Sequence, residues 1–234
     1  MNIEIRSTGP SAAAEKFSNP DTTAKGEPRA SVALDRLETL WINTGTLCNI
    51  ACVNCYIDSS PRNDRLEYIR AGEVSALLDE VETLGLATRE IAFTGGEPFM
   101  NPDMLAMTED ALARGFEVLI LTNAMQPMLR PRVKAGLLAL GDRFADKLTL
   151  RVSLDHYTAA LHEAERGADT WSKALEGLDW LAAQGFRLAI SGRTCWNEHD
   201  AASRAGYADL IASCGWPIDP ADHHRLVLLP EMDG

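Results

Sequence analysis

Three cysteines stand within one short stretch of the chain, residues 48–56, which has the sequence CNIACVNCY. Cys48, Cys52 and Cys55 follow the spacing C-x3-C-x2-C, and thiolates are soft ligands that select zinc, copper(I) or iron–sulfur clusters. A structural zinc site takes four protein ligands, and this stretch holds no fourth Cys or His. A four-iron cluster held by three cysteines would instead leave one iron free to bind a small molecule. The triad therefore favours an iron–sulfur cluster with a vacant coordination position.

A second motif, TGGEP at residues 94–98, carries residue types suited to holding a ligand. Gly95 and Gly96 lack a Cβ atom and let the backbone approach a ligand closely, and Pro98 stiffens the turn. Glu97 offers a carboxylate to a ligand amine. A motif this short is an ordinary turn in most proteins, so its weight comes from its pairing with the cysteine triad.

The elements that must position these residues follow a regular alternation of strands and helices. Nearly continuous runs of Val, Ile and Leu predict strands at residues 40–44, 89–94, 116–122, 147–155, 186–191 and 225–230. Apolar residues at helical spacing predict helices at 73–85, up to Gly115, up to about Gly141, at 170–185 and at 208–215. A long loop is expected between the fourth strand and the helix at 170–185. This α/β pattern is typical of parallel strands covered by helices, arranged as an open doubly wound sheet or as a partial (β/α)6 barrel.

In both architectures the functional residues gather at the carboxyl ends of the strands. The cysteine triad and the TGGEP motif follow the first two predicted strands, and Asn123 follows the third. Ser153, Asp155 and His156 follow the fourth strand, where His156 is placed to act as a general acid or base. Cys195 follows the fifth strand, either as a hydrogen-atom donor facing a substrate or, like most lone cysteines, as a small buried hydrophobe.

With these motifs the chain resembles the radical S-adenosylmethionine (SAM) superfamily, whose signature is C-x3-C-x2-C in the loop after the first strand of a partial barrel. The resemblance implies a partial (β/α)6 TIM-like barrel, a 4Fe–4S cluster on Cys48, Cys52 and Cys55, and SAM at the vacant iron. It also implies that GGEP lies against the methionine part of SAM. Many members have an aromatic residue or His before the third cysteine, where this chain has Asn54.

Further stretches resemble the family less closely. Asn123 belongs to a TNA sequence that is similar to the family's TNG, and Ser153 and Asp155 stand where members contact the SAM ribose or carboxylate. HEAERG at residues 162–167 resembles the family's HD..RG, which implies that Arg166 pairs with the SAM carboxylate, a shape that suits a guanidinium. A turn-forming Asn, a strand-end Ser and a solvated Arg remain the alternative interpretation.

The resemblance implies an enzyme that cleaves SAM reductively with its reduced cluster and uses the 5'-deoxyadenosyl radical to abstract hydrogen from a substrate. The pattern is most similar to the branch with molybdenum-cofactor cyclases, haem-modifying enzymes and peptide maturases. It therefore implies a small-molecule or peptide substrate and a reductant such as flavodoxin or ferredoxin. The alternative is an iron–sulfur electron-transfer or scaffold protein that never binds SAM, against which the GGEP motif counts.

Composition and organisation set the remaining expectations. Residues 1–34 are rich in Ser, Thr, Ala, Pro and charge, which predicts a mobile arm before a core domain at 35–234. Members of this branch usually extend into a region with auxiliary cluster cysteines, so the chain is expected to be either a minimal core or a C-terminally truncated form. The net charge of −12 counts against nucleic-acid binding. No apolar run of about 18 residues and no secretory signal is present, so we predict no membrane association and a cytoplasmic protein.

Overall fold

The computed structural model of the 234-residue chain describes residues 19–23, 25–31, 33, 35–194 and 196–230. The chain divides into two compact units, Met1–Asp35 and Arg36–Gly234, and each is described by itself. In the first unit, Thr22 and Pro28 form an antiparallel bridge around a turn in which Thr23 N donates to Glu27 O at 2.8 Å. Residues 1–18 lie outside the described residues, so the mobile arm stays a prediction.

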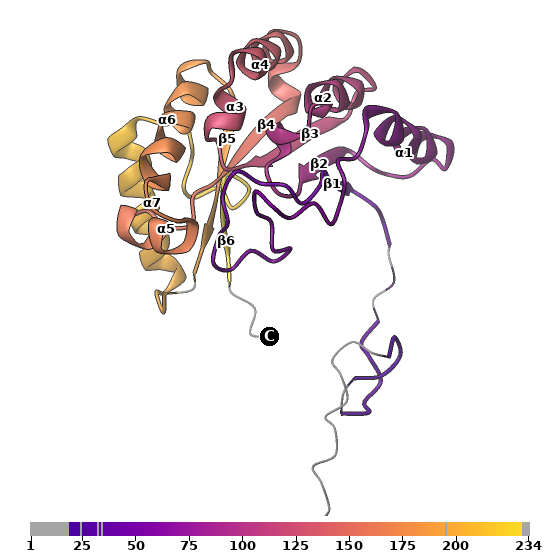
Figure 1. Cartoon of the computed structure of the whole chain (residues 1–234), viewed down its shortest axis with the longest axis horizontal. Coiled ribbons are helices and arrows are strands. Elements are labelled where there is room, and N and C mark those ends of the chain that lie inside the picture. Colours follow the sequence, from indigo (N-terminus) through magenta and orange to yellow (C-terminus); the bar gives the residue numbers. More distant parts are fainter. Residues whose placement is uncertain (1–18, 24, 32, 34, 195, 231–234) are drawn as a thin grey trace, which may run out of the picture. The chain divides into compact units, whose positions relative to one another are not determined.

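The second unit is built on one sheet of six parallel strands, each hydrogen-bonded to the next in chain order (Figure 1). The six predicted strands are confirmed, with ends that differ by at most two residues. The strands are β1 (Thr39–Asn43), β2 (Glu90–Thr94), β3 (Glu117–Thr122), β4 (Leu148–Ser153), β5 (Arg187–Arg193) and β6 (Leu226–Leu229).

The helices pack along one face of this sheet (Figure 1). The α-helices are α1 (Ala71–Thr83), α2 (Met104–Ala113), α3 (Gln126–Leu129), α4 (Pro131–Phe144), α5 (Ala159–Arg166), α6 (Thr170–Ala183) and α7 (Asp200–Cys214). Two short 3-10 helices are present, η1 (Pro98–Met100) before α2 and η2 (Ala145–Lys147) before β4. Within the described ranges, none of these helices has the length and apolar character needed to cross a bilayer.

The strand order decides between the two architectures that the sequence left open. A doubly wound sheet reverses its strand order at a switch point and carries helices on both faces. Here the order runs from β1 to β6 without reversal, and the helices lie on one face, so the sheet curves inward (Figure 1). The two end strands pair with one neighbour each in the described residues. The fold is therefore a partial (β/α)6 barrel, which confirms the sequence-based prediction.

Strand β4 shows how the sheet separates its two faces. Leu148, Leu150 and Val152 are buried in the cluster that the helices cover, whereas Thr149 and Arg151 alternate with them and are partly exposed on the other face. This alternation follows from the period of two in a strand, and each buried side chain stabilises the fold by about 1.5–3 kcal/mol. The core thus lies between sheet and helices, and the concave face carries polar residues such as Thr149 and Arg151 together with apolar ones such as Leu119.

The expected long loop after β4 is wrong, because it contains helix α5. The buried face of α5 carries His162 and Glu165 rather than apolar residues, so no apolar periodicity revealed the helix. A second correction concerns α4, which continues past Gly141 to Phe144. Gly141 allows close packing instead, since a Cβ atom there would lie 3.0 Å from Cε1 of Phe186.

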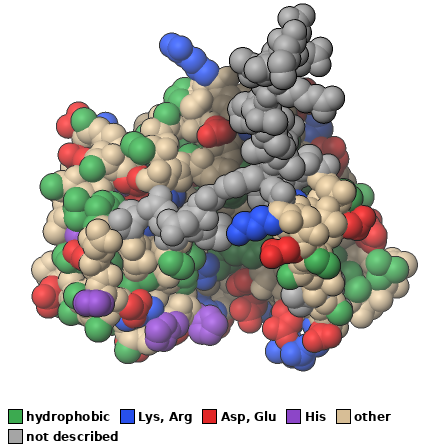
Figure 2. All heavy atoms as spheres, turned by 90° about the horizontal axis from the view of Figure 1, so that it is seen from below, with side chains coloured by type: hydrophobic (Ala, Val, Ile, Leu, Met, Phe, Trp, Pro, Cys, Tyr) green, Lys and Arg blue, Asp and Glu red, His purple; other side chains and the backbone are tan. Residues whose placement is uncertain are grey.

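Charged side chains of both signs are distributed over the surface shown in Figure 2. Asp and Glu side chains alternate there with Lys and Arg, and hydrophobic side chains are scattered among them. Elsewhere in the described residues opposite charges form ion pairs, as where Arg114 lies 2.6 Å from Asp79 and 2.9 Å from Asp110. Exposed pairs of this kind contribute at most about 1 kcal/mol each, so the surface charge says more about solvation than about the fold.

Candidate functional site

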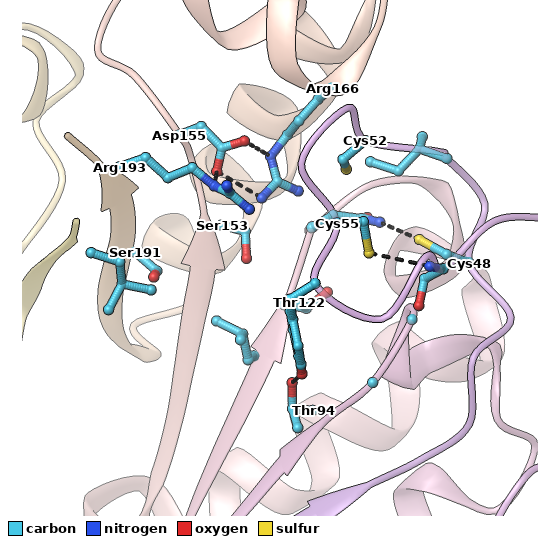
Figure 3. Close-up of a pocket in the computed structure, with 18 of the residues that line it drawn as sticks. Cys48, Cys52, Cys55, Thr94, Thr122, Ser153, Asp155, Arg166, Ser191 and Arg193 are labelled. Carbon is cyan, nitrogen blue, oxygen red and sulfur yellow. Dashed lines mark hydrogen bonds and ion pairs between the residues drawn. The ribbon is translucent and has the colours of Figure 1, made fainter. Parts of the chain in front are cut away.

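A pocket lies at the carboxyl ends of the strands, beside the loop that carries the three cysteines (Figure 3). Residues at the ends of β2 to β6 and residues of the loop after β1 contribute to its wall. The structure brings nine of the predicted site residues into this lining: Cys48, Cys52, Cys55, Gly95, Gly96, Asn123, Ser153, Asp155 and Arg166. The expectation that the strand ends converge is therefore met, and the triad and the glycine turn face the same cavity.

The three cysteines carry free thiols. Cys48 is buried, and Cys52 and Cys55 are half-buried. Burial raises the pKa of the Cys48 thiol to about 12 and also raises the pKa of Cys52, and the charge of Arg166 opposes both shifts without reversing them. Both thiols are therefore protonated at neutral pH when no metal is bound. A coordinated metal removes such a proton outright. Polar contacts already reach the sulfurs, since the backbone N–H of Ser59 donates to Cys55 Sγ at 3.2 Å.

The donor set fits an iron–sulfur cluster better than a single metal ion. Among the described residues, no three Cys, His, Asp or Glu side chains converge closely enough to hold one ion. A cluster with several irons takes one thiolate on each iron, so its ligands need not meet at a point. The hydroxyl of Ser59 also lines this pocket, is buried, and has no hydrogen-bond partner. An unpartnered buried hydroxyl beside three free thiols is consistent with a polar group that fills the cavity.

The glycine turn after β2 packs directly on the backbone that leads from β1 to the cysteines. Gly96 N donates to Gly45 O at 2.8 Å, and a Cβ atom on Gly96 would lie 2.1 Å from Leu47 O. Gly95 has a φ of +132°, in a region that L-residues avoid. From the sequence we expected these glycines to let a ligand come close to the backbone. In the structure they let two protein segments come close to each other, and this packing fixes the start of the cysteine loop against the end of β2.

Glu97 occupies a different place from the one we expected. Its carboxylate is 1% exposed and accepts hydrogen bonds from Phe99 N at 3.1 Å, Thr122 Oγ1 at 2.8 Å and Asn123 N at 2.8 Å. Burial raises the pKa of Glu97, and these hydrogen bonds oppose that effect. Neither Glu97 nor the buried Pro98 belongs to the described pocket lining. The carboxylate joins the ends of β2 and β3, and its contact with a ligand amine stays a prediction.

Asn123 lines the pocket and connects it to the cysteine loop. Its Nδ2 donates to Asn49 Oδ1 at 2.8 Å, and its Oδ1 accepts from Met125 N at 3.0 Å. The next residue, Ala124, has a φ of +58°, the left-handed conformation for which glycine is better suited. Gly177 lets α6 pack closely on this turn, since a Cβ atom on Gly177 would lie 1.9 Å from Ala124 O.

Asp155 and Arg166 contact each other at the pocket wall (Figure 3). Arg166 donates through Nε to Asp155 Oδ2 at 2.8 Å and through Nη2 to Oδ1 at 2.9 Å. This two-pronged pair is the strong form of a guanidinium–carboxylate contact. The expected partner of Arg166 was a ligand carboxylate, and the structure shows that a protein carboxylate takes two of its donors. Ser153, at the end of β4, lines the pocket nearby.

The two weaker catalytic predictions fare differently. His156 is 2% exposed and outside the described pocket lining, because its Nδ1 lies 2.8 Å from Thr158 Oγ1 and its Nε2 lies 3.3 Å from Glu198 Oε1. These contacts place His156 at the start of α5, and its role as a general acid or base stays a prediction. Cys195 lies outside the described residues.

The pocket also contains residues that the sequence reasoning did not select. Ser191 and Arg193 come from the end of β5 and Thr94 from the end of β2, and all three line the cavity. The strand-end rule could have found them, since each follows or ends a predicted strand. Glu165, which contacts the cysteine loop from α5, gave no such signal because its helix was not predicted.

Comparison with known sequences identifies the family and several relatives of this chain. The model of the Radical SAM superfamily matches residues 42–201. The mycofactocin maturase MftC of Mycobacterium ulcerans (strain Agy99) is 34% identical over 139 residues, which cover 59% of this chain and 35% of that protein. The subtilosin biosynthesis protein AlbA of Bacillus subtilis (strain 168) is 26% identical over 194 residues, 80% of this chain and 40% of that protein. The chain thus spans about a third of the length of the mycofactocin maturases it matches.

Solved structures share the fold at low sequence identity. The crystal structure of Streptococcus suis SuiB bound to S-adenosylmethionine aligns with a TM-score of 0.64 and 14% identity, over 85% of this chain and 41% of that one. The structure of histidine-tagged anSMEcpe with bound AdoMet aligns with a TM-score of 0.59 and 16% identity, over 84% and 52% of the two chains. The matched family region contains both the cysteine triad and the glycine turn, and the chain belongs to the radical SAM superfamily.

Proposed function

We propose that this chain is the core of a radical SAM enzyme in which Cys48, Cys52 and Cys55 hold a 4Fe–4S cluster beside a bound SAM. Family membership implies SAM and an iron–sulfur cluster as cofactors. The observation that carries the proposal is that the triad and the glycine turn line one pocket. When bound, the two cofactors supply an electron and a carbon radical that abstracts hydrogen from a substrate.

The Asp155–Arg166 pair is suited to the amino-acid part of SAM, which carries an ammonium and a carboxylate. Arg166 uses Nε and Nη2 on Asp155, which leaves Nη1 for a ligand carboxylate, and Asp155 offers lone pairs to an ammonium. Both side chains are nearly buried, so their contacts with a ligand are little screened by water. We propose that Ser153 and Asn123 provide further hydrogen bonds, while Gly95 and Gly96 form the floor.

A peptide precursor is the substrate class that we favour over a small-molecule cofactor precursor. The support is by analogy: relatives include a mycofactocin maturase and a subtilosin biosynthesis protein, and SuiB has been crystallised with its precursor peptide SuiA. The reaction also needs an electron donor, for which a flavodoxin or ferredoxin is proposed. A cytoplasmic location stays a prediction from the sequence.

The electron-transfer or scaffold alternative is not favoured. Such a protein needs a buried cluster but no cavity beside it, whereas this pocket continues from the cysteines past Ser153 and Asp155 to Ser191 on β5. Polar groups from several strand ends are the expected lining for a ligand in this class of fold.

Anaerobic reconstitution of the full chain with iron and sulfide tests the proposal. We expect about four irons per chain, a cluster absorbance, and formation of 5'-deoxyadenosine when SAM and dithionite are added. Cys52→Ala should abolish the cluster, whereas Cys214→Ala, at the end of α7 and away from the pocket, should not. A wild-type chain that binds a full cluster but forms no 5'-deoxyadenosine would support the electron-transfer alternative instead.

A further inference from the structure

The two residues between Cys52 and Cys55 contact the end of helix α5. Asn54 N donates to Glu165 Oε1 at 2.8 Å, and Asn54 Nδ2 donates to Glu165 Oε2 at 2.8 Å. The preceding Val53 N donates to the backbone oxygen of Glu165, also at 2.8 Å. One residue of α5 thus accepts three hydrogen bonds from two consecutive residues of the cysteine loop. Glu165 itself is 4% exposed.

A second side chain contacts the same turn from strand β5. Arg193 Nη2 donates to Asn54 O at 2.9 Å. Its Nη1 lies 3.9 Å from Glu165 Oε1 and its Nε lies 3.7 Å from Asp155 Oδ1, so its charge partly balances both acids. Glu165 therefore binds the backbone N–H and the side-chain amide of Asn54, and Arg193 binds its backbone C=O.

The cysteine loop needs such contacts because little else fixes its tip. No helix or strand lies between β1 and α1 among the described residues, and Val53 and Tyr56 are 73% and 72% exposed. The loop's other contacts include the hydrogen bond from Cys48 N to Ser60 O at 3.1 Å and a longer contact of 3.5 Å between the hydroxyls of Tyr56 and Thr94. Ligating side chains must be held to within about 0.5 Å of their working positions, and a turn in solvent does not achieve this alone.

We propose that Glu165 is a positioning residue that holds the turn between Cys52 and Cys55 so that both thiols are presented to the same cluster. The proposal rests on the proposed function, because it requires that these thiols bind a cluster. Glu165 acts through Asn54, whose backbone and side-chain N–H groups both donate to its carboxylate. A buried carboxylate between two N–H donors is well suited to the task, since hydrogen bonds to a charged acceptor are stronger than neutral ones.

A pair of substitutions separates this role from simple packing of α5. In Glu165→Gln the side-chain amide of Asn54 can turn over and accept from the new N–H group, so the contact survives. Asn54→Asp places one carboxylate against another and breaks it. The double variant Asn54→Asp/Glu165→Gln restores a donor–acceptor pair. A packing role for Glu165 alone would not produce rescue by a second change in the exposed loop.

The experiment measures iron content, cluster absorbance and the rate of iron loss to a chelator for the reconstituted full chain. We expect Glu165→Ala and Asn54→Asp to lose iron about tenfold faster than wild type or more, as expected for lost hydrogen bonds to a charged group. Glu165→Gln and the double variant should lie within about threefold of wild type. Glu163→Gln is the matched control, because Glu163 accepts from Trp171 N and not from the loop.

The outcomes distinguish this inference from the proposed function. Equal rates of iron loss for wild type, Glu165→Ala and Asn54→Asp would overturn the positioning role while leaving the cluster assignment intact. Failure of the double variant to recover would also overturn it, provided that thermal unfolding shows the metal-free variant to be folded. A wild-type chain that takes up no cluster would instead overturn the proposed function, and the positioning role with it.

Discussion

The glycine turn after β2 and the cysteine loop after β1 lie side by side at one pocket, but they are held in opposite ways. The glycine turn packs tightly against backbone, as the 2.1 Å distance from a Cβ on Gly96 to Leu47 O demonstrates. The cysteine loop is exposed at its tip and depends on a few side-chain contacts from α5 and β5. The turn therefore serves as a rigid platform, whereas the tip of the loop is held in place by side chains.

The largest effect is predicted for a substitution in the glycine turn after β2. Gly96→Ala should lower the free energy of unfolding by about 3 kcal/mol or more, because the new methyl group meets backbone that cannot move aside. Urea unfolding of the metal-free protein measures it. Gly72→Ala, which has open space in α1, should be neutral or stabilising. Val53→Ala at the exposed loop tip should change the free energy of unfolding by less than about 0.5 kcal/mol. An equal loss of stability in Gly96→Ala and Val53→Ala would contradict the difference between the turn and the loop.

The folded protein should lose stability in acid because of a histidine on α5, the helix that contacts the cysteine loop. His162 on α5 is fully buried with no hydrogen-bond partner for either ring nitrogen, and burial lowers its pKa from 6.5 to about 4. The folded state then binds this proton more weakly than the unfolded state, so stability present above pH 6.5 is lost as the pH falls toward 4.

His162→Phe should remove about 2 kcal/mol of this acid sensitivity between pH 7 and pH 5, because the group that must take up a proton is gone. The comparison of unfolding free energies at pH 7 and pH 5 measures it, with His223→Phe on the exposed surface as the control. An unchanged difference between the two pH values in His162→Phe would show that another group is responsible.

A moderate effect is expected for the carboxylate that joins β2 and β3. Glu97→Gln should cost about 2 kcal/mol, because its amide N–H group would face the N–H of Asn123, which now donates to the carboxylate. Glu117→Gln, at the exposed first residue of β3, should change the free energy of unfolding by less than about 0.5 kcal/mol. If Glu97→Gln instead retained full stability and lost only SAM affinity, the carboxylate would act on the ligand after all.

The smallest effect lies in the cysteine loop itself. Asp58 has a φ of +53°, so Asp58→Ala should lower the free energy of unfolding by about 1 kcal/mol, since alanine tolerates this conformation less well. Asp58→Gly should remain within about 0.5 kcal/mol of wild type. Denaturant midpoints of the three metal-free proteins give the comparison, and a stable Asp58→Ala would mean that the loop relaxes without cost.

The six strands and the convergence of the pocket could be predicted from the sequence, because both depend on runs of apolar residues and on the ends of parallel strands. Helix α5 could not, since its buried face carries His162 and Glu165 instead of leucines. Nor could the turning of Glu97 toward β3, because side-chain direction depends on which neighbouring donors the folded chain supplies. The contact of Asn54 with Glu165 joins residues 111 positions apart, which no local pattern reveals.

The unclosed sheet has a consequence for the wall of the pocket. Strand β6 is the last of the six, and its Leu229, which lines the pocket, is half exposed. Among the described residues no seventh strand covers this edge, so an apolar side chain of the pocket wall is also part of the solvent-accessible surface.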